Sequence, residues 1–348
     1  MRPLVQPPKA RPGDRIAVLS PSFAAPAVAP AVHEQAMERL RTLTGLEPVE
    51  YPTTRELGAH PADRARDLVA AFTDPSIRAV LATIGGEDQV RVTGLLDPEL
   101  VRAAPKPLLG YSDNTNLLQW LWSAGVAAFH GGSTQVHLGA GPGVDAVHAA
   151  SLRAALLTGE RLEITEPGES EDFGVRWESP EALTSYGERE TTEPWEWSGP
   201  QRVVTGRTWG GCLEVFPMIA LAGRLDVTAE DLAGGVLLLE TSEEVTPAHV
   251  LARNLEALAQ RGLIESAGAV LLARPASSNH ESVPSPATRA AHRQEVADAV
   301  REVVERHNPD AIVVSGVPFG HTRPQWVLPH GGEMTVDAAQ QRIWADYA

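Results

Sequence analysis

The stretch "PLLGYSDNTNLLQWLWSAG", Pro107 to Gly125, joins a short apolar run to a helical pattern, with Ser112 between them. The run "PLLGY" is typical of a buried strand, and apolar residues then recur at helical spacing from Leu117 to Trp122. A serine at this point can simply cap the helix, because its hydroxyl accepts a free backbone N–H. It can also be a nucleophile that a sharp strand-to-helix turn displays over the positive end of a helix dipole. The residues that lie near Ser112 in the fold decide between these two interpretations.

Short β-rich runs alternate with helical patterns around this stretch. We predict strands at 15–20 and 79–84, and helices at 29–43, 62–72 and 113–123. In the helix at 62–72, Arg64 and Arg66 are expected on the outer face. The alternation predicts a parallel sheet covered by helices, with ligands bound beyond the carboxyl ends of the strands. Gly85-Gly86 and Ser112 both lie at such ends.

A segment without regular periodicity interrupts the alternation between about Glu160 and Pro200. It is acidic, and it carries aromatic residues that need a packing partner: Phe173, Trp177, Tyr186, Trp195 and Trp197. We interpret it either as a functional loop or as a packed connector. Within it, Trp195 and Trp197 lie next to the second domain and are expected to be packing anchors.

Further α/β patterns follow the irregular segment. The run "GGCLEVFPMIALAG" at 210–223 looks helical, "GVLLLE", "GAVLLA" and "AIVVSG" look like strands, and 294–306 looks like a charged helix. The expected fold is therefore α/β, with an N-terminal parallel-sheet domain over 1–165 that carries the nucleophile. The expected fold continues with an aromatic linker over 166–200 and a smaller C-terminal α/β domain over 201–348. The active site is expected between the two domains.

Composition limits the partners of the chain. Its 348 residues are too many for one core of typical size, which agrees with two domains. The net charge of -16, from 45 acidic and 29 basic residues, argues against a nucleic acid or an anionic membrane as partner. Cys212 is the single cysteine, so neither an intrachain disulfide nor a cysteine metal cluster is expected. No signal peptide, membrane span or metal-ligand spacing is recognisable, so we predict a cytoplasmic protein without a metal.

A serine nucleophile needs a base, usually histidine, and a carboxylate that orients the base. Glu240 ends the strand "GVLLLE", and His321 follows the strand "AIVVSG" in the loop "GVPFGHTRPQW". Neither residue is specific alone, because strand-end glutamates and loop histidines are usually just exposed to solvent. The chain order Ser, Glu, His is that of α/β-hydrolases. However, Gly110-Tyr111-Ser112-Asp113-Asn114 lacks the last glycine of the G-x-S-x-G motif.

Six segments in order along the chain carry a resemblance to a known family. They are "KARPGDRIAVLSPS", "ATIGGEDQVRVTGLLD", "KPLLGYSDNTNLLQWLWSAGVAAFHGG", "TWGGCLEV", "LLLETSEE" and "GVPFGHTRPQWVLPHG". They resemble the motifs of the LD-carboxypeptidase family of serine peptidases. The form "LETSEE" and the tryptophan-rich central segment are most similar to the branch that contains the microcin C self-immunity protein.

The resemblance implies a catalytic triad of Ser112, Glu240 and His321. It also implies an oxyanion hole formed by the backbone N–H groups of Gly86 and Asp113. This agrees with the physical chemistry, since a glycine pair lets the backbone approach a substrate and a helix N-terminus attracts an anion. No cofactor is implied, and family members are commonly homodimers.

The predicted substrate contacts are Gly85, Trp177 and Cys212. Cys212 stands where the family often has asparagine, which alters the hydrogen bonds available there because a thiol is a weak donor. As alternatives, Cys212 could be a core residue or a rival nucleophile. In the resembling branch the substrate is an aminoacyl-adenylate analogue, whose base Trp177 would stack on. An LD-carboxypeptidase that releases D-alanine from murein tetrapeptide, and a catalytically silent binding protein, are the alternatives.

Overall fold

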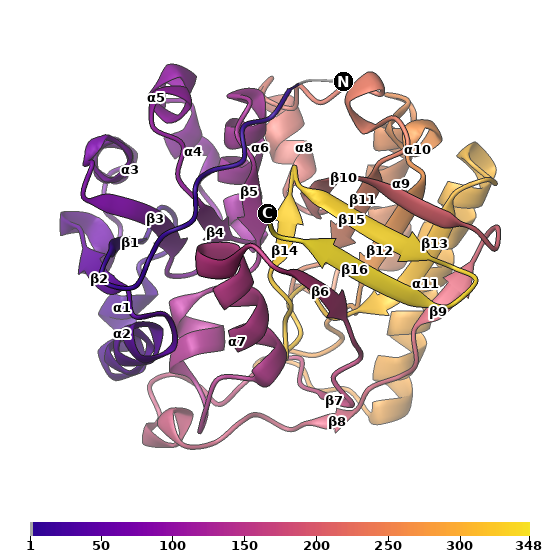
Figure 1. Ribbon diagram of the computed structural model, residues 1–348. Helices are drawn as coiled ribbons and strands as arrows, with labels where there is room; N and C mark the ends of the chain where they lie inside the picture. The colour runs from indigo at the N-terminus through magenta and orange to yellow at the C-terminus, as the bar shows by residue number, and fades with distance from the viewer. Residues whose placement is uncertain (1–2) are drawn as a thin grey trace.

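The computed structural model describes residues 3–348, which fold around two β-sheets (Figure 1). The first sheet has six strands in the order β14-β5-β4-β3-β1-β2, of which β1 to β5 are parallel. Its strands are β1 (Arg15–Leu19), β2 (Glu47–Glu50), β3 (Ile77–Ala82), β4 (Leu108–Gly110), β5 (Ala128–His130) and β14 (Leu328–His330). The order 2-1-3-4-5 is a doubly wound one, in which ligands bind beyond the carboxyl ends of the strands. The predicted parallel α/β unit is confirmed.

Helices cover this sheet on both faces, as the alternating pattern predicts. They are α1 (Ala25–Val28), α2 (Pro30–Thr44), α3 (Pro61–Thr73), α4 (Val90–Thr93), α5 (Pro98–Ala103), α6 (Thr115–Ser123) and α7 (Ala146–Arg153). Helix α3 starts with Pro61 at its first position, and the His60 side chain accepts the Ala62 N–H. Proline is tolerated there because its missing N–H would have had no partner within the helix.

The expectation that Arg64 lies on the outer face of α3 is wrong. Its side chain is 5% exposed, and its guanidinium forms two hydrogen bonds of 2.7 Å with the carboxylate of Asp88. It also donates to the backbone carbonyls of Pro21 and Ser22. Helical periodicity places Arg64 near the edge of the apolar face, but it cannot show that two loops supply partners for the charge. Arg64 thereby holds together the loops that follow β1 and β3.

The second sheet has eight strands in the order β6-β16-β15-β10-β11-β12-β13-β9, and β10 to β13 are parallel. Its strands are β6 (Arg161–Ile164), β9 (Glu196–Ser198), β10 (Val203–Cys212), β11 (Val236–Glu240), β12 (Ala269–Ala273), β13 (Ile312–Val317), β15 (Glu333–Asp337) and β16 (Arg342–Asp346). Helices α8 (Phe216–Leu221), α9 (Ala248–Ala259), α10 (Leu263–Ser266) and α11 (Pro286–His307) belong to this half. No helix within residues 3–348 is long and apolar enough to cross a membrane.

Two strands cross between the halves of the molecule. Strand β14, from near the C-terminus, pairs with β5 of the first sheet, and β6, from before residue 165, pairs with β16 of the second. Figure 1 shows the yellow β14 lying beside the magenta β5. The two halves are therefore joined by exchanged strands as well as by a connecting segment.

The expectation of a helix from residue 210 is wrong at its start, because Gly210, Gly211 and Cys212 belong to β10. A Cβ atom on Gly210 would lie 1.8 Å from the carbonyl oxygen of Leu238 on β11. Only glycine permits this close approach of two backbones. The low strand propensity of glycine conceals the strand in the sequence, and the helix itself is confined to α8.

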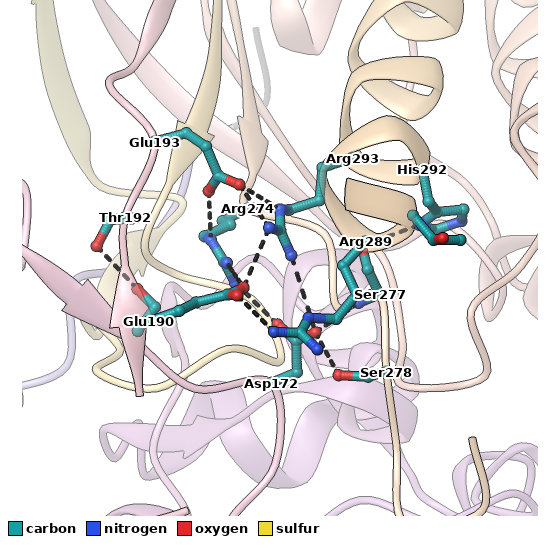
Figure 2. Close-up of polar contacts among 12 residues, drawn as sticks. Asp172, Glu190, Thr192, Glu193, Arg274, Ser277, Ser278, Arg289, His292 and Arg293 are labelled. Carbon is teal, nitrogen blue, oxygen red and sulfur yellow. Dashed lines mark hydrogen bonds and ion pairs between the residues drawn. The ribbon is translucent and has the colours of Figure 1, made fainter. Parts of the chain in front are cut away.

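The segment over 166–200 contains a short hairpin of β7 (Glu169–Ser170) and β8 (Glu190–Thr191). A cluster of charges, in which the arginines and Asp172 are buried, fastens it to the second half of the molecule (Figure 2). We call this the arginine cluster; its members are Asp172, Glu190, Glu193, Arg274, Arg289 and Arg293. Trp195 and Trp197 pack against the hydrophobic core, as expected for packing anchors.

Candidate active site

Ser112 lies in a sharp turn between β4 and α6. Its φ angle is +62°, in the left-handed region that residues with a side chain seldom adopt. Such strain persists only where surrounding contacts enforce it, and it is concentrated at functional sites. The residue is half-buried, at the carboxyl edge of the first sheet. The turn therefore holds Ser112 in a strained conformation at the edge of the sheet, and Tyr111 rather than Ser112 occupies the capping position of the helical turn that follows.

The side chain of Asp113 fastens this turn to its surroundings. Its carboxylate accepts hydrogen bonds from the Ser22 hydroxyl at 2.6 Å, the Gln89 N–H at 2.9 Å and the Asn116 amide at 2.9 Å. Burial raises the pKa of the Asp113 carboxyl. The neighbouring Asn114 donates to a carbonyl in the loop after β3. These contacts bind the loops after β1, β3 and β4 into one rigid edge around Ser112.

In the glycine pair after β3, Gly85 lies directly against Ser112 and Gly86 lies against the loop that follows β1. A Cβ atom on Gly85 would stand 2.8 Å from Ser112 Oγ, so any side chain there would collide with the serine. Gly86 has a φ of +152°, and a Cβ atom there would lie 2.1 Å from Ser22 Oγ. Both positions therefore require glycine, and the backbone at Gly85 borders the space in front of Ser112.

Glu240 and His321 meet at the carboxyl edge of the second sheet. Glu240 ends β11 and is fully buried, and its Oε2 lies 2.5 Å from His321 Nδ1. The other oxygen, Oε1, lies 3.7 Å from Nε2 of the buried His130. The His321 ring packs edge-on against the ring of Tyr111, with centroids 5.0 Å apart. The structure thus brings the predicted carboxylate and histidine into contact, beside the residue that precedes Ser112.

Electrostatics keep this pair ionised. Burial acts to raise the pKa of Glu240, but His321 and His130 outweigh burial and lower it to about 2. Burial acts to lower the pKa of His321, but Glu240, Glu243 and Glu214 raise it to about 9. A carboxylate that accepts from Nδ1 leaves Nε2 as the atom available for proton transfer.

Two polar residues hold the loop that carries His321. The Arg323 guanidinium donates to Asp145 at 2.6 Å and to the carbonyls of residues 136, 140 and 143. Its backbone pairs with Glu171 of the central segment, at 2.8 and 2.9 Å. The amide of Gln325 accepts the Gly132 N–H and donates to the carbonyl of residue 320. The His321 loop is thereby fixed to the first half of the molecule and to the central segment.

The other predicted substrate contacts lie in packed surroundings. Cys212 is 1% exposed, its N–H donates to Thr115 Oγ1 at 3.1 Å, and its thiol donates to Glu214 at 3.2 Å. Burial holds the pKa of this thiol well above its usual value, which leaves it a neutral thiol and a poor nucleophile. Trp177 is half-buried and packs on a small apolar cluster formed by Ala29, Val32, Ala140 and Ala182.

Sequence reasoning missed several residues that build the site. They are Ser22, Arg64, His130 and Arg323, together with the side chain of Asp113. Ser22 and Arg323 follow predicted strands, and this position was an available signal. His130 ends β5. Their partners come from distant loops, which no local pattern reveals. Within residues 3–348, no group of three or more His, Cys, Asp or Glu side chains is arranged to hold a metal ion.

Comparison with protein families assigns both halves of the molecule. The model described as the LD-carboxypeptidase N-terminal domain matches residues 16–131, and that described as the C-terminal domain matches 205–336. The chain belongs to the LD-carboxypeptidase family. Two curated relatives are each named "Putative carboxypeptidase". That from Vibrio cholerae is 28% identical over 93% of this chain and 92% of its own, and that from Streptomyces coelicolor is 31% identical over 78% of each chain.

The expected resemblance to the microcin C self-immunity branch is also confirmed. This LD-carboxypeptidase family member is 24% identical to the microcin C7 self-immunity protein MccF of Escherichia coli, over 81% of this chain and 77% of that protein. The structure of MccF in complex with glutamyl sulfamoyl guanosine superimposes with a TM-score of 0.82, at 21% identity, over 99% of this chain and 98% of that one. An MccF-like protein from Streptococcus pneumoniae in complex with AMP has a TM-score of 0.81 at 24% identity, over 96% and 99%. These structures share the two-sheet fold.

Proposed function

We propose that this chain is a serine hydrolase that uses Ser112, His321 and Glu240 as its catalytic triad. It would cleave an amide-type bond near a free carboxylate. The observation that carries the proposal is a strained, displayed serine beside a buried Glu–His pair, with Tyr111 linking the two. A silent binding protein has no need for the backbone strain at Ser112 or for the ionised pair beside it.

In the proposed reaction, Ser112 Oγ attacks the carbonyl carbon of the substrate and passes its proton to His321 Nε2. Glu240 holds the ring through Nδ1 and stabilises the imidazolium as it forms. The imidazolium then gives its proton to the leaving nitrogen, and the C–N bond breaks. A water molecule hydrolyses the resulting ester by the same two proton transfers and regenerates Ser112.

The backbone N–H groups of Gly86 and Asp113 are the proposed oxyanion hole. Asp113 lies in the first turn after Ser112, where backbone N–H groups have no partner within the helix. Gly86 directly follows Gly85, which lies against Ser112. Two such donors stabilise the negative charge that develops on the carbonyl oxygen, and removing one typically costs about 10²–10³ in rate.

The proposed substrate is an aminoacyl nucleotide analogue, whose base would stack on the central segment. Support comes from the match to MccF and from the structures of MccF and its relative with nucleotides. The alternative is a murein tetrapeptide that loses D-alanine, which the family name and the curated carboxypeptidase relatives favour. Both substrates present an amide-type bond to the same triad.

Mass spectrometry of a substrate panel tests the proposal. The panel contains aminoacyl sulfamoyl adenylates and murein tetrapeptide, incubated with the wild type and with Ser112→Ala. We expect the wild type to release the free amino acid from an adenylate and Ser112→Ala to release none. Release of D-alanine alone would select the carboxypeptidase alternative. Equal product from both proteins would exclude Ser112 as the nucleophile.

A further inference from the structure

Glu243 is a charged residue next to the triad that the proposed reaction does not use. It follows the end of β11 by three residues, and its side chain is 60% exposed. From there it reaches inward, so that Oε2 lies 3.1 Å from Nε2 of the buried His321. Within residues 3–348, His321 is the one residue with which Glu243 forms an ion pair. The adjacent Glu244 is also exposed and has no ion pair with His321 within the same residues.

This contact lies at the atom that must receive the proton of Ser112, and its geometry is that of an ion pair rather than of a hydrogen bond. His321 faces a carboxylate at each nitrogen, Glu240 at Nδ1 and Glu243 at Nε2. A ring placed between two carboxylates is stabilised as the imidazolium, which cannot act as a base. Burial opposes that charge, but Glu240 and Glu243 outweigh it and raise the pKa of His321 to about 9. In the free enzyme, Glu240 and Glu243 therefore favour the protonated form of the base.

The remaining groups around His321 do not supply an alternative partner for Glu243. Burial holds the pKa of His137, which packs on Tyr111, well below its usual value, so that it stays neutral. Tyr111 is itself uncharged, because burial raises the pKa of its hydroxyl. His130 lies at Oε1 of Glu240, on the far side of that carboxylate from His321.

Of the three acids near His321, which are Glu240, Glu214 and Glu243, Glu243 is the one that a ligand can reach from solvent. Glu240 is fully buried and engaged by His321. Glu214 accepts hydrogen bonds from Cys212 and Ser242, and burial raises its pKa toward the neutral form. An ion pair with one exposed partner is weak, because water competes for the exposed group. A second cation can therefore draw Glu243 away from His321.

We propose that Glu243 is a specificity-determining residue that receives the ammonium group of an aminoacyl substrate. This exchange lets the His321 imidazolium lose its Nε2 proton to solvent, after which Nε2 can accept the proton of Ser112. The inference rests on the proposed function. In an aminoacyl compound the α-ammonium is attached one carbon from the scissile carbonyl, so a carbonyl placed at Ser112 brings the ammonium close to the His321 ring. The enzyme then acquires a free base only when a substrate with a free amino group is bound.

Binding to inactive variants tests the exchange without turnover. The probes are an aminoacyl sulfamoyl adenylate with a free amino group and its N-acetyl counterpart, titrated by calorimetry into Ser112→Ala. We expect at least tenfold tighter binding of the free amine. In Ser112→Ala/Glu243→Gln the preference should disappear, and in the matched control Ser112→Ala/Glu244→Gln it should remain. Equal preference in all three proteins, or no binding of either probe to Ser112→Ala, would overturn the proposal.

Histidine NMR provides a second, independent measurement. We expect Glu243→Gln to lower the pKa of His321 by about one pH unit, since an opposite charge within hydrogen-bonding distance typically shifts a pKa by about 1–3 units. Glu244→Gln should leave it in place. An unchanged titration in Glu243→Gln would also refute the contact.

The two proposals fail in different ways. If the wild type hydrolyses neither probe while the amine preference depends on Glu243, the hydrolase function is wrong and Glu243 remains an ammonium receptor. If Ser112-dependent hydrolysis occurs and Glu243→Gln keeps the amine preference, the function stands and the role of Glu243 is wrong.

Discussion

The arginine cluster and the group of charges around His321 each combine buried side chains with one exposed acid, but their charges are balanced differently. In the arginine cluster three guanidinium groups face three carboxylates (Figure 2). Arg274 contacts all three acids at 2.8 to 3.2 Å, and Arg293 contacts the same three at 2.5 to 4.0 Å. Around His321, the carboxyl groups of Glu240, Glu243 and Glu214 all act to raise the pKa of one imidazole, and a second imidazole, His130, lies beside Glu240. The first group is saturated with opposite charge, whereas the second has an excess of acid.

This difference in charge balance suits the two groups to different roles. Guanidinium groups stay charged at any physiological pH, so a matched arginine cluster fixes the geometry of the segment that it holds. Histidine changes charge near neutrality, and an excess of acid around it shifts the pH at which it does so. We therefore expect changes near His321 to affect the rate and changes in the arginine cluster to affect stability.

The largest effect is expected for Ser112→Ala. It removes the nucleophile, so turnover should fall by about 10⁴–10⁶-fold, as in serine proteases. Stability should hardly change, because the half-buried hydroxyl adds little to the core. Ser112→Gly is a matched control that is equally inactive. Its free energy of unfolding should exceed that of Ser112→Ala by about 1 kcal/mol, because glycine adopts the +62° φ angle without strain. Thermal unfolding should show this as a higher midpoint temperature. Normal turnover in either variant would remove Ser112 from the reaction.

Glu240→Gln should be the next most damaging change. Glutamine preserves the shape but cannot stabilise the imidazolium, so we expect kcat to fall by roughly 10⁴-fold with little change in KM. The pH profile of kcat/KM supplies the mechanistic readout. In the wild type, His321 must lose its proton to act, so kcat/KM should rise with pH up to about 9.

In Glu240→Gln this rise should move to lower pH, because the raised pKa of His321 depends on the lost charge. A profile that stayed in place would show that Glu240 does not control the base. A large rise in KM with kcat preserved would assign it to substrate binding instead.

Arg274→Met tests whether the arginine cluster contributes to stability. The arginine side chain is 2% exposed and its partner Asp172 is 3% exposed, so the variant leaves a buried carboxylate with a lost partner. We expect a loss of about 3 kcal/mol in the free energy of unfolding, measured by urea denaturation. Arg301→Met is the matched control, since Arg301 pairs with Asp298 at the surface and its loss should cost less than about 0.5 kcal/mol. Equal stability of the two variants would mean that the arginine cluster contributes nothing to holding the segment.

The same contrast explains how far the sequence alone could lead. The parallel strands, the displayed Ser112 and the Glu240–His321 pair follow patterns that are local: apolar runs, the residues that end them, and the family motifs. The sequence does not reveal the strand at Gly210–Cys212, because glycine is generally rare in strands. Glycine is required here by the close approach of the β11 backbone, which a local pattern does not show. Arg64 was misplaced because its partners, Asp88 and two carbonyls, belong to other loops.

The arginine cluster shows the limit most clearly. Its acids lie in a segment without periodicity, and its arginines lie about 80 to 120 residues further along the chain. Nothing in either stretch predicts that they pair. Contacts of this kind depend on the tertiary fold, and a single sequence does not contain them as a pattern.

Trp177→Ala is expected to have the smallest effect, and it asks whether the segment held by the arginine cluster also binds substrate. Trp177 is half-buried and packs on an apolar cluster, so part of its ring is still accessible. If the ring stacks on adenine, the variant should lose about 1–3 kcal/mol of binding, or roughly a tenfold to hundredfold rise in KM for an aminoacyl sulfamoyl adenylate. A murein peptide has no base to stack, so its KM should hardly change.

Trp195→Ala is the control for this measurement, because Trp195 packs against the hydrophobic core and should affect stability more than KM. Thermal unfolding of both variants separates the two effects. A Trp177→Ala protein that folds and binds the adenylate normally would remove Trp177 from the site. If the adenylate bound equally well to variants of every aromatic residue from Phe173 to Trp197, the segment would be a structural connector, and the arginine cluster would hold it for stability alone.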